Sequence, residues 1–136
     1  MARRELAPGT TGTATLRVTA SDTAKALSPE HDPLFPEVLA TARLIAWLEL
    51  AAGRALTGIL EPGEQSVGIM VDVRHTAPTP VGGTIRANAR FVGLEGKLYR
   101  FEVSAEDEAG EVGRGTHARA IIDAARLVAG AEKRRR

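Results

Sequence analysis

The chain has 136 residues, of which 43% are apolar and 26% are charged, and its formal net charge is +1. This length and composition predict one globular domain spanning residues 1–136, large enough to bury its own core. The small net charge gives no indication of a nucleic-acid or membrane partner. Without cysteine the chain has no disulfide and no thiol nucleophile. Its three histidines, at positions 31, 75 and 117, lack zinc-ligand spacing, so no metal is expected.

The N-terminal sequence Met1-Ala-Arg-Arg-Glu-Leu has no apolar stretch of the kind found in signal peptides. No apolar run approaches the ~20 residues of a membrane-spanning helix. We therefore expect a cytoplasmic protein.

The first predicted element is a half-buried strand over residues 11–20, where small or apolar residues alternate with threonine and arginine. Residues 21–36 hold turn formers and three prolines, which predict a loop or short helical turns. Long irregular loops often act as lids or binding loops.

A long, largely apolar helix is predicted from Pro36 to the turn Glu61-Pro-Gly-Glu. Proline is favoured in a first helical turn, and Glu37 suits the positive end of the helix dipole. Several alanines keep the helix thin enough for a sheet to approach. Apolar residues recur at helical spacing, at Val38, Ile45, Leu48, Ala52, Ala55 and Ile59.

Four strands are predicted after the helix, over residues 66–76, 84–92, 97–106 and 111–123. Glu95-Gly96 and Ala109-Gly110 mark hairpin turns. In the first of these strands, alternation places five residues on one apolar face: Val67, Ile69, Val71, Val73 and His75. Residues 124–136 predict a short helix that ends in a basic tail.

One apolar helix among five strands must be covered by the sheet. We therefore predict an α+β fold in which a curved antiparallel sheet wraps around the helix, the hot-dog architecture. Such a sheet leaves open edges, so a homodimer is expected.

Glu49 and His75 are the polar residues predicted to face the apolar interior, where an unpaired charge is costly. A structural interpretation places Glu49 on the solvent side near Arg54, or in a pair with Arg43. The functional interpretation makes Glu49 a general base or nucleophile and His75 a proton shuttle.

Thr41 is a third candidate, although a threonine within a helix often bonds to a carbonyl one turn earlier. Eight positions separate Thr41 from Glu49, which on an ideal helix gives about 80° of rotation and ~12 Å of rise. These side chains cannot touch within a straight helix. Either a substrate lies along the helix or one group comes from a second protomer.

Several blocks between residues 34 and 122 occur in the order, and with the gaps, of a known family. They are Phe35-Pro-Glu-Val, Ala40-Thr41, Glu49, Leu60-Glu-Pro-Gly-Glu, Gly68, His75-Thr-Ala-Pro-Thr-Pro and Gly115-Thr-His-Ala-Arg119-Ala. Together they resemble the fluoroacetyl-CoA thioesterase type of hot-dog protein.

The resemblance implies homodimers with the substrate near the subunit interface. It implies no cofactor, because coenzyme A is part of the substrate. It also implies roles for six residues: catalytic Thr41, Glu49 and His75, acyl contacts from Gly68 and Arg119, and an acyl-pocket cover from Phe35. His117 is interpreted as structural. The basic residues 133–136 are interpreted as a solubilising tail, or as a contact for the phosphates of coenzyme A.

The predicted function is hydrolysis of a small acyl-CoA thioester. The thioester oxygen would be held by backbone N–H groups or the Thr41 hydroxyl, with Glu49 acting as base or nucleophile and His75 moving protons. A non-catalytic acyl-CoA or small-ligand binding module is the alternative. An acyl-CoA dehydratase of the same fold ranks lower, because no aspartate–histidine pair of the hydratase kind occurs in one block.

Overall fold

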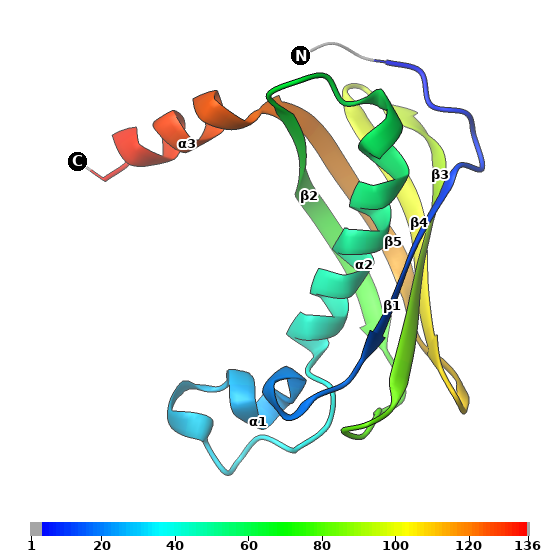
Figure 1. The fold of residues 1–136 in the computed structure, drawn as a ribbon, viewed down its shortest axis with the longest axis vertical. Helices are drawn as coiled ribbons and strands as arrows, with labels where there is room; N and C mark the ends of the chain where they lie inside the picture. Colours follow the sequence, from blue (N-terminus) through cyan, green and yellow to red (C-terminus); the bar gives the residue numbers. More distant parts are fainter. Residues whose placement is uncertain (1–3, 136) are drawn as a thin grey trace.

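A curled antiparallel sheet holds one long helix against its concave face in the computed structural model, which describes residues 4–135 (Figure 1). Short helical turns and one terminal helix complete the chain. The elements in order are β1 (Thr11–Arg17), η1 (Ala20–Asp22), α1 (Ala24–Leu27), η2 (Pro29–His31), α2 (Thr41–Leu56), η3 (Thr57–Ile59), β2 (Glu64–His75), β3 (Thr84–Glu95), β4 (Leu98–Asp107), β5 (Gly110–Asp123) and α3 (Ala124–Lys133).

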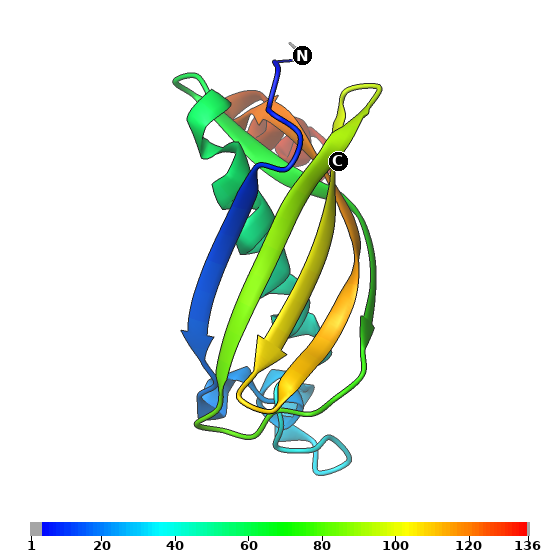
Figure 2. The same cartoon turned by 90° about the vertical axis from the view of Figure 1, so that its right-hand side faces the viewer.

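The sheet has five strands in the order β1-β3-β4-β5-β2, and every neighbouring pair is antiparallel (Figure 2). This is the predicted α+β architecture, with all five expected strands present. The strands β1 and β2 form the two edges. The free edge of β2 therefore carries backbone groups without a partner strand in this protomer.

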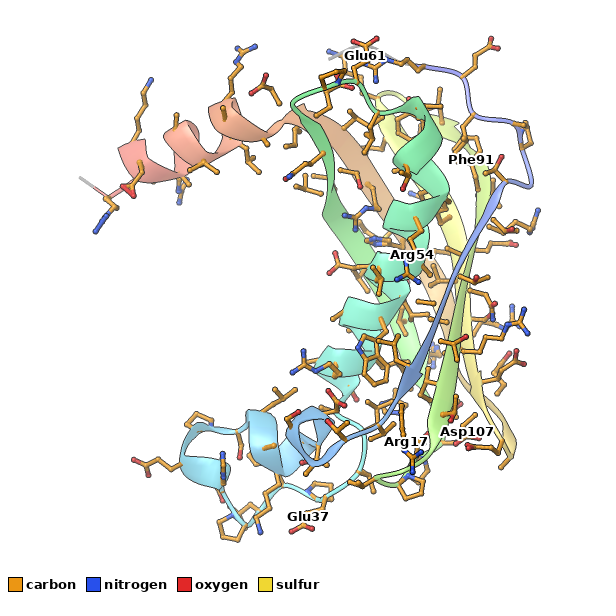
Figure 3. The ribbon with its side chains drawn as sticks, viewed as in Figure 1. Arg17, Glu37, Arg54, Glu61, Phe91 and Asp107 are labelled. Atoms are coloured by element: carbon orange, nitrogen blue, oxygen red, sulfur yellow. The ribbon has the colours of Figure 1, made fainter. Side chains whose placement is uncertain are left out.

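The core lies between α2 and the sheet, where side chains fill the space (Figure 3). Buried apolar residues of α2, such as Leu44 and Leu48, belong to one core cluster with Phe91 and Phe101 from the strands. A Cβ atom on Gly12 would lie 2.0 Å from the carbonyl oxygen of Ala51. The close approach of β1 to α2 therefore requires glycine at position 12.

The start of the long helix differs from the prediction, because α2 begins at Thr41 and not at Pro36. The backbone before it is extended and already bonded elsewhere. The Leu39 amide donates to the Thr79 carbonyl at 2.9 Å, and the Ala40 amide donates to the Asp22 carbonyl at 2.9 Å. These tertiary bonds outweigh the helix-start signal at Pro36 and leave Val38 outside the helix.

The remaining predictions of local structure are confirmed within a few residues. Residues 20–31 form short helical turns, and Ile59 lies in η3, just beyond α2. The terminal helix α3 projects away from the sheet (Figure 1). Residues 1–3 and Arg136, which include parts of the predicted N-terminus and basic tail, lie outside the described range. Within residues 4–135, no helix combines the length and apolar character needed to cross a membrane.

Candidate active site

Thr41 and His75 form a hydrogen-bonded pair where the start of α2 meets the end of β2. The distance from Thr41 Oγ1 to His75 Nδ1 is 2.7 Å. Thr41 is exposed, whereas His75 Nε2 is buried and has no hydrogen-bond partner among residues 4–135. Burial lowers the pKa of His75, and the backbone of Ala77 opposes this only in part. A neutral imidazole is therefore available to accept the hydroxyl proton.

The first turn of α2 lacks the side-chain cap that most helices carry. Its N-cap residue is Ala40, whose methyl side chain cannot accept a hydrogen bond from the first amides of the helix. Thr41 is the first residue of the helix, so these free N–H groups lie beside its hydroxyl. Together with the helix dipole they can stabilise a negatively charged oxygen.

Two cavities flank this helix start. One has a volume of about 400 Å³ and is lined by residues that include Thr41, His75 and Pro36. The other has a volume of about 430 Å³, is lined mainly by apolar residues, and has Thr41 and Phe35 in its wall. Phe35 is 47% exposed, so its ring lies at the rim. Thr41 thus borders both an apolar chamber and the imidazole.

The segment that follows Phe35 contacts α1. Glu37 lies at the end of the molecule that carries α1, away from Glu61 in the loop between η3 and β2 (Figure 3). Lys25 Nζ of α1 lies 3.2 Å from Glu37 Oε1. This exposed ion pair links α1 to the segment that follows Phe35.

Glu49 lies near the middle of α2, in a second polar cluster. Its Oε2 lies 3.4 Å from Arg119 Nη1 and 4.0 Å from His117 Nε2. The Glu49 side chain is 37% exposed, so a ligand can reach it, whereas Arg119 and His117 are buried. Glu49 is therefore neither on the solvent stripe nor in the fully dry interior that the sequence pattern suggested.

The two arginines offered as structural partners of Glu49 bind elsewhere. Arg54 Nη1 donates to the Thr13 carbonyl at 2.9 Å, which links α2 to β1 (Figure 3). Arg43 Nε lies 3.2 Å from Asp22 Oδ1. The partner of Glu49 is Arg119, seventy positions later in the chain.

A bulge in β2 brings Gly68 under the Glu49 carboxylate. The register shifts between Gly68 and Met70, so Gly68 lies opposite Arg119 while His75 lies opposite Gly113. Opposed residues share a face, so Gly68 faces α2 with His75, and the expected alternation through Val67 and Ile69 is wrong. A Cβ atom on Gly68 would lie 2.1 Å from Glu49 Oε2. Only glycine leaves room for the carboxylate at this position.

The predicted site residues therefore form two groups within one protomer. Thr41, His75 and Phe35 lie at the start of α2, whereas Glu49, Gly68 and Arg119 lie further along it. Among residues 4–135 no hydrogen bond or ion pair joins the two groups. Ser66, whose hydroxyl accepts from Arg119 Nε at 2.9 Å, had not been predicted.

Comparisons with known proteins give the chain its family. The family model described as fluoroacetyl-CoA-specific thioesterase matches residues 18–125. The chain belongs to this family. A fluoroacetyl-CoA thioesterase of Streptantibioticus cattleyicolor is 45% identical over 95 residues, which cover 70% of this chain and 68% of that protein. Membership confirms the predicted enzyme class, an acyl-CoA thioesterase.

Solved structures agree with this assignment. A variant of the fluoroacetyl-CoA-specific thioesterase, crystallised with fluoroacetate and CoA, is 39% identical and has a TM-score of 0.83, over 89% of this chain and 98% of that chain. A hot-dog-like protein from Thermanaerovibrio acidaminovorans is 24% identical, with a TM-score of 0.78 over 93% of this chain and 91% of that chain. The thioesterase thus has the predicted hot-dog fold.

Proposed function

We propose that this thioesterase hydrolyses a short-chain acyl-CoA, with its thioester group bound beside the Thr41–His75 pair. The observation that carries the proposal is the 2.7 Å hydrogen bond between these side chains, at the mouth of an apolar cavity. The acyl chain lies in that cavity under Phe35. A relative that holds fluoroacetate and CoA supports a small acyl group.

In the proposed reaction the thioester oxygen accepts hydrogen bonds from the free amides of α2, or from the Thr41 hydroxyl when that hydroxyl accepts a hydrogen bond from His75 Nδ1. A water oxygen adds to the carbonyl carbon, the carbon–sulfur bond breaks, and a proton reaches the sulfur. A thiolate leaves readily because a thiol has a pKa of about 8.5, so little acid assistance is needed. His75 moves the proton, and no cofactor takes part.

Glu49 is proposed to act as general base on water, or as a nucleophile that forms an anhydride with the acyl group. Single turnover in ¹⁸O-labelled water separates a general base from an anhydride that water attacks at the Glu49 carboxyl carbon. A general base delivers the labelled oxygen to the acid product. A nucleophile leaves an unlabelled Glu49 oxygen in the product when water attacks the carboxyl carbon of Glu49.

The proposal includes a homodimer formed through the free edge of β2. This edge exposes Ile69 by 55% and Val71 by 39%, although both are large apolar residues. Pairing with the same strand of a second copy satisfies the backbone and covers these side chains. The Thr41–His75 pair of one protomer then acts with Glu49 of the other, which resolves their separation along α2.

The first experiment measures thiol release from a series of acyl-CoA thioesters. Glu49→Gln is expected to lower kcat by at least ~100-fold, and His75→Ala to lower it similarly, since each removes a proton-transfer group. Glu106→Gln, an exposed carboxylate on β4, is the matched control and should keep full activity. If no thioester is hydrolysed while acyl-CoA still raises the melting temperature, the protein is a binding module.

Mixed dimers test whether the two groups act across the interface. Glu49→Gln and His75→Ala chains are unfolded and refolded together in equal amounts. If Glu49 and His75 of different protomers act together, half of the dimers carry one intact site, and about a quarter of wild-type activity returns. If both residues act within one protomer, the mixture stays inactive.

A further inference from the structure

His117 occupies the interior of the Glu49 cluster and uses both of its ring nitrogens. It lies on β5 and is only 1% exposed. Its Nδ1 lies 2.7 Å from the backbone carbonyl oxygen of Met70, and its Nε2 lies 3.1 Å from Arg119 Nη1. The sequence had favoured a structural role for this residue, but its contacts place it directly behind the arginine that holds Glu49.

These two contacts fix the protonation state of the ring. A carbonyl oxygen can only accept, so Nδ1 must carry the proton and donate it to Met70. A guanidinium can only donate, so Nε2 must be unprotonated and accept from Arg119. The neutral form with the proton on Nδ1 is the one state of His117 that satisfies both neighbours.

The environment of the ring supports the neutral form. Burial lowers the pKa of His117, and the charge of Arg119 lowers it further, while the Met70 carbonyl and Glu49 oppose the shift in part. A second proton on Nε2 would point at a guanidinium. The acceptor role of Nε2 is therefore stable near neutral pH.

The guanidinium of Arg119 is held on three sides. Its Nε donates to Ser66 Oγ at 2.9 Å and its Nη2 donates to the Ser66 carbonyl at 2.8 Å. Gly53 of α2 lies above it, where a Cβ would be 4.0 Å from Nε. His117 holds Nη1, the same nitrogen that reaches Glu49 Oε2 at 3.4 Å. Removing the His117 acceptor therefore frees the end of Arg119 that meets Glu49.

We infer that His117 is a positioning residue for catalysis: as a neutral acceptor it orients Arg119, which in turn places the Glu49 carboxylate over Gly68. The inference rests on the proposed role of Glu49. This positioning role gives a reason for a histidine at position 117, two residues before Arg119 and on the same inward face of β5. The effect is expected in kcat, since a misplacement of about 1 Å can cost a factor of 100.

Two isosteric substitutions separate this role from simple packing. His117→Gln places an amide near the position of Nε2 and can still accept from Arg119. His117→Asn places its amide near Nδ1, so it keeps the bond to Met70 and loses the acceptor. We expect His117→Asn to lower kcat by about tenfold or more at similar KM, with His117→Gln clearly more active. Both variants lose one hydrogen bond, so their melting temperatures should fall alike.

A long-range ¹H–¹⁵N correlation spectrum tests the same inference without substrate. The wild-type protein should show the His117 tautomer with the proton on Nδ1 near neutral pH. A proton on Nε2, or His117→Asn at least as active as His117→Gln, would overturn the inference. If wild type hydrolyses no thioester, the proposed function fails first, and the tautomer still decides whether His117 holds Arg119 as described.

Discussion

The substitution Gly68→Ala tests the geometry of the Glu49 cluster most directly. The new Cβ would lie 2.1 Å from Glu49 Oε2 and 3.2 Å from His117 Cε1. The carboxylate must therefore retreat to at least the 3.4 Å of an ordinary contact. Its present 3.4 Å separation from Arg119 Nη1 is already near the limit of a hydrogen bond, so the pair is expected to break.

The cost in folding stability should be small, because the displaced atoms are the end of a flexible, partly exposed side chain. Alanine also reduces the freedom of the unfolded chain, which stabilises by about 0.4–1 kcal/mol. We expect the free energy of unfolding to change by less than ~1 kcal/mol. The activity should nevertheless fall by about tenfold or more, because the carboxylate leaves the position proposed for catalysis.

Gly12→Ala provides the contrast. Its Cβ would lie 2.0 Å from the Ala51 carbonyl oxygen, which is helix backbone and cannot turn away. A comparable overlap should therefore cost about 1–3 kcal/mol of stability. Gly58→Ala, with no atom within 4 Å of the new Cβ, is the neutral control.

Denaturant unfolding and thiol release are measured for all three variants. The reasoning predicts that Gly68→Ala loses activity and keeps stability, whereas Gly12→Ala loses stability. Wild-type activity in Gly68→Ala would show that Glu49 does not need its present position. A loss of stability equal to that of Gly12→Ala would show that the carboxylate cannot move as assumed.

Four further outcomes are expected. Thr41→Val should lower kcat for thiol release by ~100-fold, whereas Thr41→Ser should keep most of the activity. The pKa of His75 is lowered from its usual 6.5, so its neutral form favours folding above about pH 6.5. This contribution to the free energy of unfolding should shrink as the pH falls towards the lowered pKa. The sign is checked by measuring the free energy of unfolding of His75→Gln and of wild type at each pH. Ile69→Lys should elute as a monomer in size-exclusion chromatography and lose activity. Thr79→Val removes the 2.7 Å bond from a buried hydroxyl to Asp107, and should cost about 1–3 kcal/mol in denaturant unfolding at unchanged kcat.

The strands could be predicted because their signals are local. Period-two alternation and a glycine at each hairpin lie within a few residues of one another, and they located all four strands after α2. The start of α2 could not be predicted, because it depends on bonds from Leu39 to Thr79 and from Ala40 to Asp22. The local sequence pattern around Pro36 contains no information about such tertiary bonds.

The site shows the same division. Glu49, His75 and Thr41 were candidates from the sequence pattern itself, and Gly68 was added through a resemblance carried by ordered sequence blocks. Their grouping could not be read from spacing, because one bulge at Ile69 reverses the facing of the residues before it. The pairing of Glu49 with Arg119 likewise depends on how β5 lies beside β2.

The two inward-facing histidines suit different tasks because their partners differ. His117 lies between a group that can only accept and a group that can only donate, so any proton transfer at its ring breaks one of its bonds. The partner of His75 is a hydroxyl, which can donate or accept. The Thr41–His75 bond therefore persists whether the proton lies on the oxygen or on Nδ1. A ring that can change state without losing its partner is suited to moving protons, and a ring that cannot is suited to holding Arg119 still.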